Sequence, residues 1–351
     1  MTVVPEDHEF ALLLTHDVDR PYKTYQFPYY ALRDRDPGQL WTGLTGKNPF
    51  WTFDDLCAVE DELGVRSSFN FLDERHLFDL PVRDWFKPKN WRLFTGRYSL
   101  TDPAIVDLIR RLESEDWEVG LHGSYFSYLQ RDQLEREKVK LESILEGELL
   151  GGRQHYLNID VPLTWRYQRS VGLKYDTSLG SNKQYGFGGE YGILRPFDDD
   201  FVVFPLTVME TALPDPGESF ETAWRELDAL LDEAAENDAV MSVLWHPRFF
   251  AVEDFPGHRR LYRRLVRTAL ERGAWVGSPG ELYKQLEHPS TGRDRVPADR
   301  QWATLTDGRT DGGRTAGPDY GVERATGEQG DESNHDADDD QSGRPADRTR
   351  E

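Results

Sequence analysis

Residues 10–19 read Phe-Ala-Leu-Leu-Leu-Thr-His-Asp-Val-Asp, so an apolar run is followed at once by two closely spaced carboxylates. The run 10–14 predicts a buried β-strand. In an extended chain, residues two apart face the same side, so Asp17 and Asp19 point together while Val18 points away. Two carboxylates that converge beyond an apolar strand are costly unless they share a cation or a proton. The segment therefore predicts a functional site. The alternative is an aspartate-rich turn in which Asp19 caps the residues that follow.

Outward from this strand, short apolar runs alternate with helical patterns as far as about residue 288. Further strands are predicted at 66–72, 117–121, 154–159, 173–176, 201–208, 240–245 and 275–277. Helices are predicted at 53–63 behind a Thr52 cap, from a Thr101 cap to about 112, and at 131–150, 220–237 and 258–272. Such alternation implies a mostly parallel sheet covered by helices, with functional residues at the carboxyl ends of the strands.

Three of the nine histidines sit at the ends of predicted strands: His122, His155 and His246. One such histidine is more often an ordinary core or loop residue. Three of them, in a chain that already has a carboxylate pair, favour a metal site. Asp and His side chains with open coordination positions suit a divalent cation, and zinc is the first choice.

Three motifs resemble those of the polysaccharide deacetylase family, also called NodB-homology or carbohydrate esterase family 4. They are Thr15-His16-Asp17-Val18-Asp19, Glu118-Val119-Gly120-Leu121-His122-Gly123-Ser124-Tyr125 and Leu244-Trp245-His246. The resemblance spans about 10–287. It implies a distorted (β/α) barrel with fewer than eight strands, and a metal-dependent enzyme that removes acetyl groups from N-acetylated sugars.

The resemblance also implies roles for individual residues. Asp17 is similar to the catalytic base and Asp19 to a metal ligand, with His122 as a second ligand. His246 is similar to the general acid, and Arg153 to the arginine that orients the base.

A weaker correspondence gives Asp176 the role of orienting His246. Residues that border these motifs are expected to contact the substrate: Tyr125, Tyr156 and Trp245.

The second motif departs from the family pattern at one position. The family carries two histidines four residues apart there, but this chain has Phe126 in place of the second. His155 is the candidate for the third metal ligand because it follows the predicted strand end at Arg153. Without it, metal binding is in doubt. A catalytically inactive, carbohydrate-binding member of the fold is therefore one alternative, and a hydrolase of linear or cyclic non-sugar amides is another.

The composition limits the partners. Acidic residues number 64 against 42 basic ones, which gives a net charge of −22. This charge opposes binding to nucleic acids and to anionic membrane surfaces. A surface adapted to high salt, as in a halophile, accounts for it; a merely acidic protein is the alternative. The single cysteine, Cys57, rules out an intramolecular disulfide.

Residues 1–288 are expected to form the catalytic domain, and 289–351 a disordered acidic tail without branched apolar clusters. No ordinary secretion signal and no membrane span is apparent, so a cytoplasmic location is expected. The segment 22–51 is rich in aromatic residues that suit either a saccharide cleft or a packed lid. Together with the location, it favours a sugar intermediate of surface-glycan assembly as the substrate.

Overall fold

The computed structural model describes residues 3–23, 48–87, 90–91, 93–94, 97–197 and 199–287. Residues 24–47, which make up most of the aromatic segment 22–51, lie outside the described residues, and so does the predicted tail 289–351. None of the helices within the described ranges is long and apolar enough to cross a membrane.

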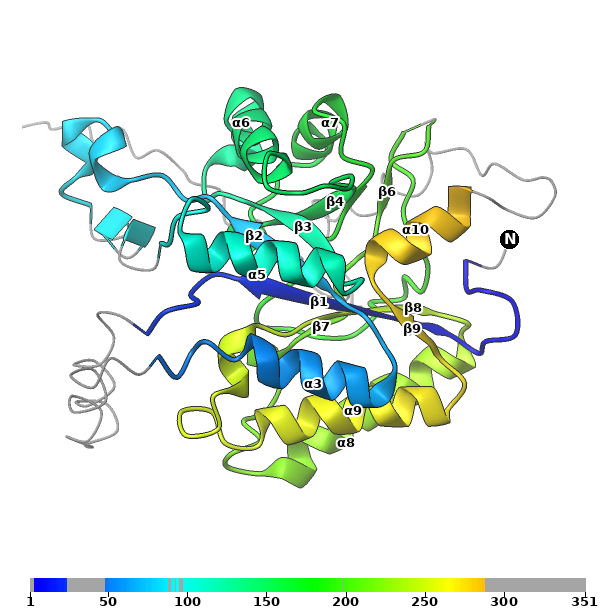
Figure 1. Ribbon diagram of the computed structural model, residues 1–351. Helices are drawn as coiled ribbons and strands as arrows, with labels where there is room; N and C mark the ends of the chain where they lie inside the picture. The colour runs from blue at the N-terminus through cyan, green and yellow to red at the C-terminus, as the bar shows by residue number, and fades with distance from the viewer. Residues whose placement is uncertain are drawn as a thin grey trace, which may run out of the picture.

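The core is a parallel sheet whose strands follow the order β6-β5-β4-β3-β2-β1-β8-β7, with β9 paired to β1 (Figure 1). The bounds are β1 Ala11–Val18, β2 Ser68–Leu72, β3 Glu118–Gly123, β4 Gly151–Gln154, β5 Tyr175–Asp176, β6 Val202–Val203, β7 Val208–Met209, β8 Val240–Leu244 and β9 Trp275–Gly277. Because these pairs of named strands are parallel, their carboxyl ends share one edge of the sheet.

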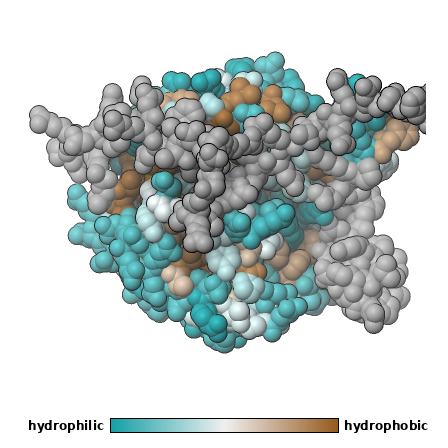
Figure 2. Space-filling model, turned by 180° about the vertical axis from the view of Figure 1, so that it is seen from behind, coloured by the Kyte–Doolittle hydropathy of each residue, from teal (hydrophilic) through white to brown (hydrophobic). Residues whose placement is uncertain are grey.

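Helices cover the sheet on both sides, with α6 and α7 above the strands in Figure 1 and α3, α8 and α9 below them. The bounds are α3 Phe53–Leu63, α5 Pro103–Ser114, α6 Arg131–Glu142, α7 Leu163–Ser170, α8 Phe220–Glu236, α9 His258–Glu271 and α10 Pro279–Glu287. Short 3-10 helices lie at Leu77–Asp79, Val82–Asp84, Ser127–Leu129, His155–Leu157, Glu210–Ala212 and Pro247–Phe250. The surface seen from behind is mostly hydrophilic, with small hydrophobic patches (Figure 2). The predicted distorted (β/α) barrel is confirmed.

Strand β1 is the hub of the sheet. Residues 11–15 pair with β8, residues 11–13 pair with β9, and residues 15–18 pair with β2. Since a strand has only two edges, β9 and β2 share one of them, one behind the other. The whole of β1 is buried, including its polar residues Thr15, His16 and Asp17. The barrel is distorted because its central strand changes partner halfway along.

Several boundaries differ from the predicted ones. The sheet has nine strands among the described residues, against fewer than eight expected, because strands of two or three residues add to the five that are longer. The predicted strand 154–159 is wrong: β4 ends at Gln154, and a 3-10 helix follows. The helix predicted at 131–150 ends at Glu142.

The two expected caps also differ. Thr52 makes no side-chain cap and instead donates its hydroxyl to the Pro247 carbonyl, while Asp102 rather than Thr101 caps α5.

Glycine lets β3 and β4 approach closely. A Cβ atom placed on Gly152 would lie 1.9 Å from the Leu121 carbonyl oxygen, a distance that no side chain tolerates. The neighbouring residue in β4 is Arg153, whose register partner in β3 is His122. The glycine thereby brings two candidate site residues side by side.

His16, which lies between Thr15 and Asp17 in β1, belongs to a buried polar cluster on the core side of the strand. The carboxylate of Glu60, in α3, accepts hydrogen bonds from Ser67 Oγ at 2.8 Å, Trp117 Nε1 at 2.6 Å and Tyr262 Oη at 2.6 Å. The fourth contact, at 3.0 Å, joins Glu60 to His16 Nε2. We call these five residues the Glu60 cluster. It ties α3 and α9 to β1 and to the residues directly before β2 and β3.

Candidate metal and hydrolytic site

The carboxyl ends of four strands bring the candidate residues together. Asp17 lies near the end of β1, with Asp19 just beyond it, and His122 lies near the end of β3. His155 directly follows β4, and one residue separates His246 from the end of β8. Residues distant in sequence therefore meet at one edge, as the strand-end rule predicts.

Asp19 stands at the centre of this group. Its Oδ1 is 3.1 Å from His122 Nε2 and 3.7 Å from His155 Nε2. Its Oδ2 is 3.2 Å from His246 Nε2 and 3.3 Å from an Arg248 guanidinium nitrogen. Burial raises the pKa of Asp19, but the surrounding imidazoles outweigh burial and hold this pKa well below its usual range. Asp19 is therefore an ionised carboxylate surrounded by three histidines that can act as metal ligands or proton donors.

A divalent cation fits three of these side chains. One ligand atom from each of Asp19, His122 and His155 falls within 4.8 Å of the others. The Nδ1 atom of His122 contacts the Arg153 carbonyl at 3.0 Å, and Nδ1 of His155 contacts a Glu74 carboxylate oxygen at 3.2 Å. With the proton on Nδ1 facing these acceptors, each Nε2 would be available to a cation that Asp19 also binds. Such outer partners are typical of metal-binding histidines.

Asp17 is held at one oxygen. Its Oδ1 accepts hydrogen bonds from Asn70 Nδ2 at 2.8 Å and Arg153 at 3.0 Å. Its Oδ2 is 3.8 Å from His122 Nε2. Burial works against the charged form, but Arg153, His122 and His246 together lower the pKa of Asp17. Arg153 is held in turn by the Thr177 carbonyl and the Thr15 hydroxyl. The result is an oriented, ionised carboxylate.

His246 has a buried carboxylate partner, Glu210, that sequence reasoning missed. The distance from His246 Nδ1 to Glu210 Oε1 is 2.7 Å. Burial lowers the pKa of His246, but the charges of Glu210 and Asp19 reverse the effect and raise it to about 9. The imidazole is therefore protonated at neutral pH. The signal for Glu210 was available, since it directly follows β7 as the other site residues follow their strands.

Asp176 does not orient His246, so that expectation is wrong. Its two oxygens accept hydrogen bonds from Trp165 Nε1, Gln168 Nε2 and the Ser178 backbone and hydroxyl. These donors occupy the carboxyl group in the interior between β5 and α7.

The residues expected to contact substrate separate into two groups. Trp245 is 1% exposed, and its ring packs against His258 and Tyr262 of α9, so its expected substrate contact is wrong. Alternation along β8 turns its side chain to the core when His246 faces the site. Tyr156 is 39% exposed; its ring centroid is 4.5 Å from that of His155 and 5.5 Å from that of Tyr125. Both tyrosines therefore lie beside the site.

Behind this site, a buried carboxyl group predicts pH-dependent stability. Burial raises the pKa of Glu137 from 4.5 to about 7, against opposing hydrogen bonds from Ser124 and Gln133. The unfolded chain therefore loses this proton first, and stability falls as pH rises from about 4.5 to 7. The difference corresponds to about 3 kcal/mol. Urea unfolding at pH 5 and pH 8 is expected to show this loss in the wild type and not in Glu137→Gln. An equal pH dependence in both proteins would contradict it.

The comparisons with known proteins are structural. No family model matches the sequence, and no curated protein sequence matches it. A protein of Mycobacterium smegmatis, provisionally assigned as a polysaccharide deacetylase, has a TM-score of 0.52 at 17% identity, over 83% of this chain and 96% of that one. A similarly assigned protein of Pseudomonas aeruginosa has a TM-score of 0.50 at 12% identity, over 82% and 94%. The allantoinase PuuE has a TM-score of 0.51 at 13% identity, also over 82% and 94%. At identities this low, the structural likeness shows the fold alone. The chain has the fold of polysaccharide deacetylases.

Proposed function

We propose that this protein is a metal-dependent hydrolase that removes N-acetyl or related acyl groups from a sugar. The observation that carries the proposal is that a carboxylate with a lowered pKa and a histidine with a raised pKa lie beside one candidate cation site. Asp17 is an oriented, ionised base, and His246 is a protonated acid. Both lie within reach of the Asp19, His122 and His155 group. A binding module would need no such acid and base, which speaks against the inactive alternative.

A divalent cation, with Zn²⁺ as the preferred candidate, would supply Lewis acidity that polarises the acyl carbonyl and makes a water molecule easier to deprotonate. Asp17 accepts the proton of the attacking water at its free Oδ2, while Asn70 and Arg153 fix Oδ1. His246 donates its Nε2 proton to the departing nitrogen, because an amide anion leaves poorly. Glu210 holds the imidazole by Nδ1 and keeps it protonated until that transfer.

The proposal is tested with metal content and acetate release measured on one preparation. The zinc-loaded wild type is expected to hold one cation per chain and to release acetate from N-acetylated sugars. His155→Ala should lose both properties, because it removes one of three ligands. His8→Ala is the control, since the His8 side chain is exposed and its Nδ1 contacts the nearby Glu6 carbonyl, away from the site.

Metal without acetate would contradict the deacetylase proposal while leaving the site intact. Full metal content in His155→Ala would contradict the ligand assignment instead.

A second candidate function is hydrolysis of a non-sugar amide. The acid, the base and the ligand group act on the amide itself, and an allantoinase has the same fold. Allantoin and simple N-acyl amines therefore belong in the substrate panel. Turnover of these compounds without turnover of N-acetylated sugars would favour this second function.

A further inference from the structure

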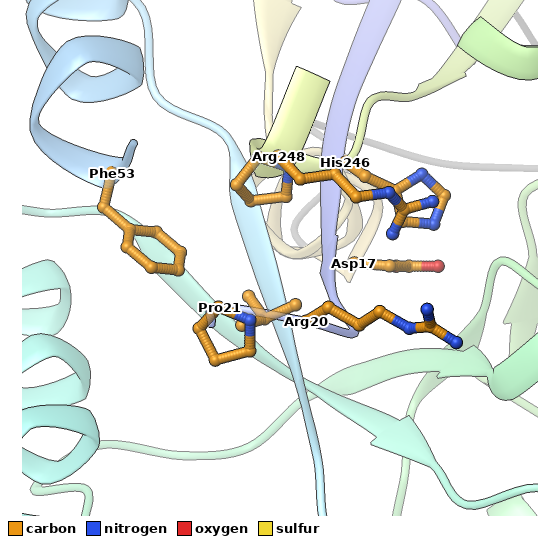
Figure 3. A pocket seen from close by; sticks show the side chains of 8 residues that line it. Asp17, Arg20, Pro21, Phe53, His246 and Arg248 are labelled. Carbon is orange, nitrogen blue, oxygen red and sulfur yellow. The ribbon is translucent and has the colours of Figure 1, made fainter. Parts of the chain in front are cut away.

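Two arginines flank the candidate acid and base. Arg20 follows Asp19 directly, and Arg248 follows His246 by two residues. Both line the small pocket that Asp17 and His246 also line. In Figure 3 the guanidinium groups of Arg20 and Arg248 extend toward the same side as the Asp17 carboxylate and the His246 ring. The chain thus aims two further cations at the place where the amide is proposed to react.

Within the part of the chain that the structure describes, neither arginine has a carboxylate partner that it does not share. The ion pair of Arg248 among these residues, at 3.3 Å, joins it to the Asp19 oxygen that also faces His246, and its guanidinium lies over the Phe249 ring. Within the described residues, no hydrogen bond or ion pair involves Arg20. Some surface arginines elsewhere have closer acidic partners, as in the 2.8 Å contact of Arg66 with Asp61.

The charges around the proposed reaction centre leave a positive surplus. Arg153 pairs with Asp17 at 3.0 Å, and His246 pairs with Glu210 at 2.7 Å. On the proposed function, a divalent cation offsets both Asp19 and the buried Glu74 carboxylate behind its ligand His155. Among the described residues, no other acid then lies within ion-pair distance of Arg20 or Arg248. A local surplus of positive charge is notable in a chain of net charge −22, because the rest of the surface repels anions.

We propose that Arg20 and Arg248 bind an anionic group, a carboxylate or a phosphate, that the substrate carries next to its acylated nitrogen. Guanidinium groups form charge-assisted hydrogen bonds with both kinds of anion. The anion belongs next to the amide because both arginines share one small pocket with the acid and the base. In a 2-acylamino sugar, that position corresponds to a substituent on ring carbon 1 or 3. This inference rests on the proposed function and narrows its substrate class.

The test compares four N-acetylated sugars as substrates of the zinc-loaded enzyme. N-acetylglucosamine 1-phosphate carries a phosphate beside the amide, and N-acetylmuramic acid carries a carboxylate there. N-acetylglucosamine 6-phosphate carries a distant anion, and N-acetylglucosamine carries none. The wild type is expected to show at least about tenfold higher kcat/KM for one or both adjacent-anion sugars than for the other two. The better of the two identifies the anion as phosphate or carboxylate.

Arg20→Gln and Arg248→Gln should each lower that preference ratio about tenfold or more, and their metal content is measured alongside. Arg225→Gln removes one exposed charge of α8, away from the pocket, and should keep the wild-type ratio. Equal kcat/KM for all four sugars would overturn the inference and leave the deacetylase function standing. An equal loss on every sugar in the arginine variants would also overturn it, because the arginines would then serve the amide itself.

If no sugar releases acetate, calorimetric binding decides the inference separately. Tighter binding of an adjacent-anion sugar than of N-acetylglucosamine, with the difference abolished in Arg20→Gln and Arg248→Gln, would uphold the anion site while the deacetylase function fails. Absence of any such difference would overturn the anion site.

Discussion

Asp17→Asn is expected to lower the rate of acetate release by about a hundredfold or more without changing the metal content. The amide keeps the size of the carboxylate but cannot accept a proton from water, and proton-transfer groups contribute factors of about 10² to 10⁴. Metal should stay bound because the proposed ligands are Asp19, His122 and His155. Steady-state acetate release at saturating zinc, with metal analysis of the same sample, measures both quantities.

The control for this prediction is Asp176→Asn. Asp176 is as buried as Asp17, but its oxygens are occupied by Trp165, Gln168 and Ser178. The substitution is expected to cost stability and to leave turnover per folded molecule near the wild-type value. Comparable activity losses in the two variants would contradict the assignment of Asp17 as the base.

Glu60→Ala is expected to lower the free energy of unfolding by about 3–5 kcal/mol, because it removes the acceptor on which the Glu60 cluster converges. The buried donors of Ser67, Trp117 and Tyr262 would lose their partner, and His16 its carboxylate. Urea or guanidinium unfolding measures the change.

Glu62→Ala is the matched control. Glu62 lies on the same helix but pairs at the surface with Arg263 and Arg267, so its loss should cost about 0–1 kcal/mol. Glu60→Gln, which keeps one acceptor, should fall between the two and supplies a measurement if the alanine variant does not fold. Equal stability of Glu60→Ala and Glu62→Ala would contradict the role of the cluster.

The fold and the candidate residues at the strand ends were predictable, because both follow from the local pattern of apolar and polar residues. Apolar runs mark the strands, and a polar residue directly after such a run marks the functional edge. Asp19, His122 and His246 each come directly after an apolar residue at or just beyond a strand end, and Asp17 lies near the end of β1. Their partners were harder to predict because burial and contact, rather than local pattern, define them. Asn70 and Glu74 reach the site from in and just after β2, and no spacing in the sequence links them to Asp17 or His155.

The errors have physical causes as well. Gly151 and Gly152 lack the side chains that a strand pattern requires, so β4 was placed too late in the chain. Trp245 adjoins a site residue in sequence, but alternation along the strand sends it to the core. Asp176 also lies at a strand end, yet its neighbours satisfy it completely. Position at a strand end therefore finds candidates, while only three-dimensional contacts separate the functional ones from the structural ones.

The partners of β1 determine when the site forms during synthesis. Ala11 pairs with Val240 and with Trp275, so the strand that carries Asp17 is completed by segments made more than two hundred residues later. Contacts this distant in sequence form slowly, and during synthesis they cannot form until the ribosome has made the later segments. The carboxylates at the end of β1 therefore take their final positions after nearly the whole barrel has emerged. A chain that has been made only as far as β8 has neither the complete sheet nor the acid, His246, that the proposed reaction requires.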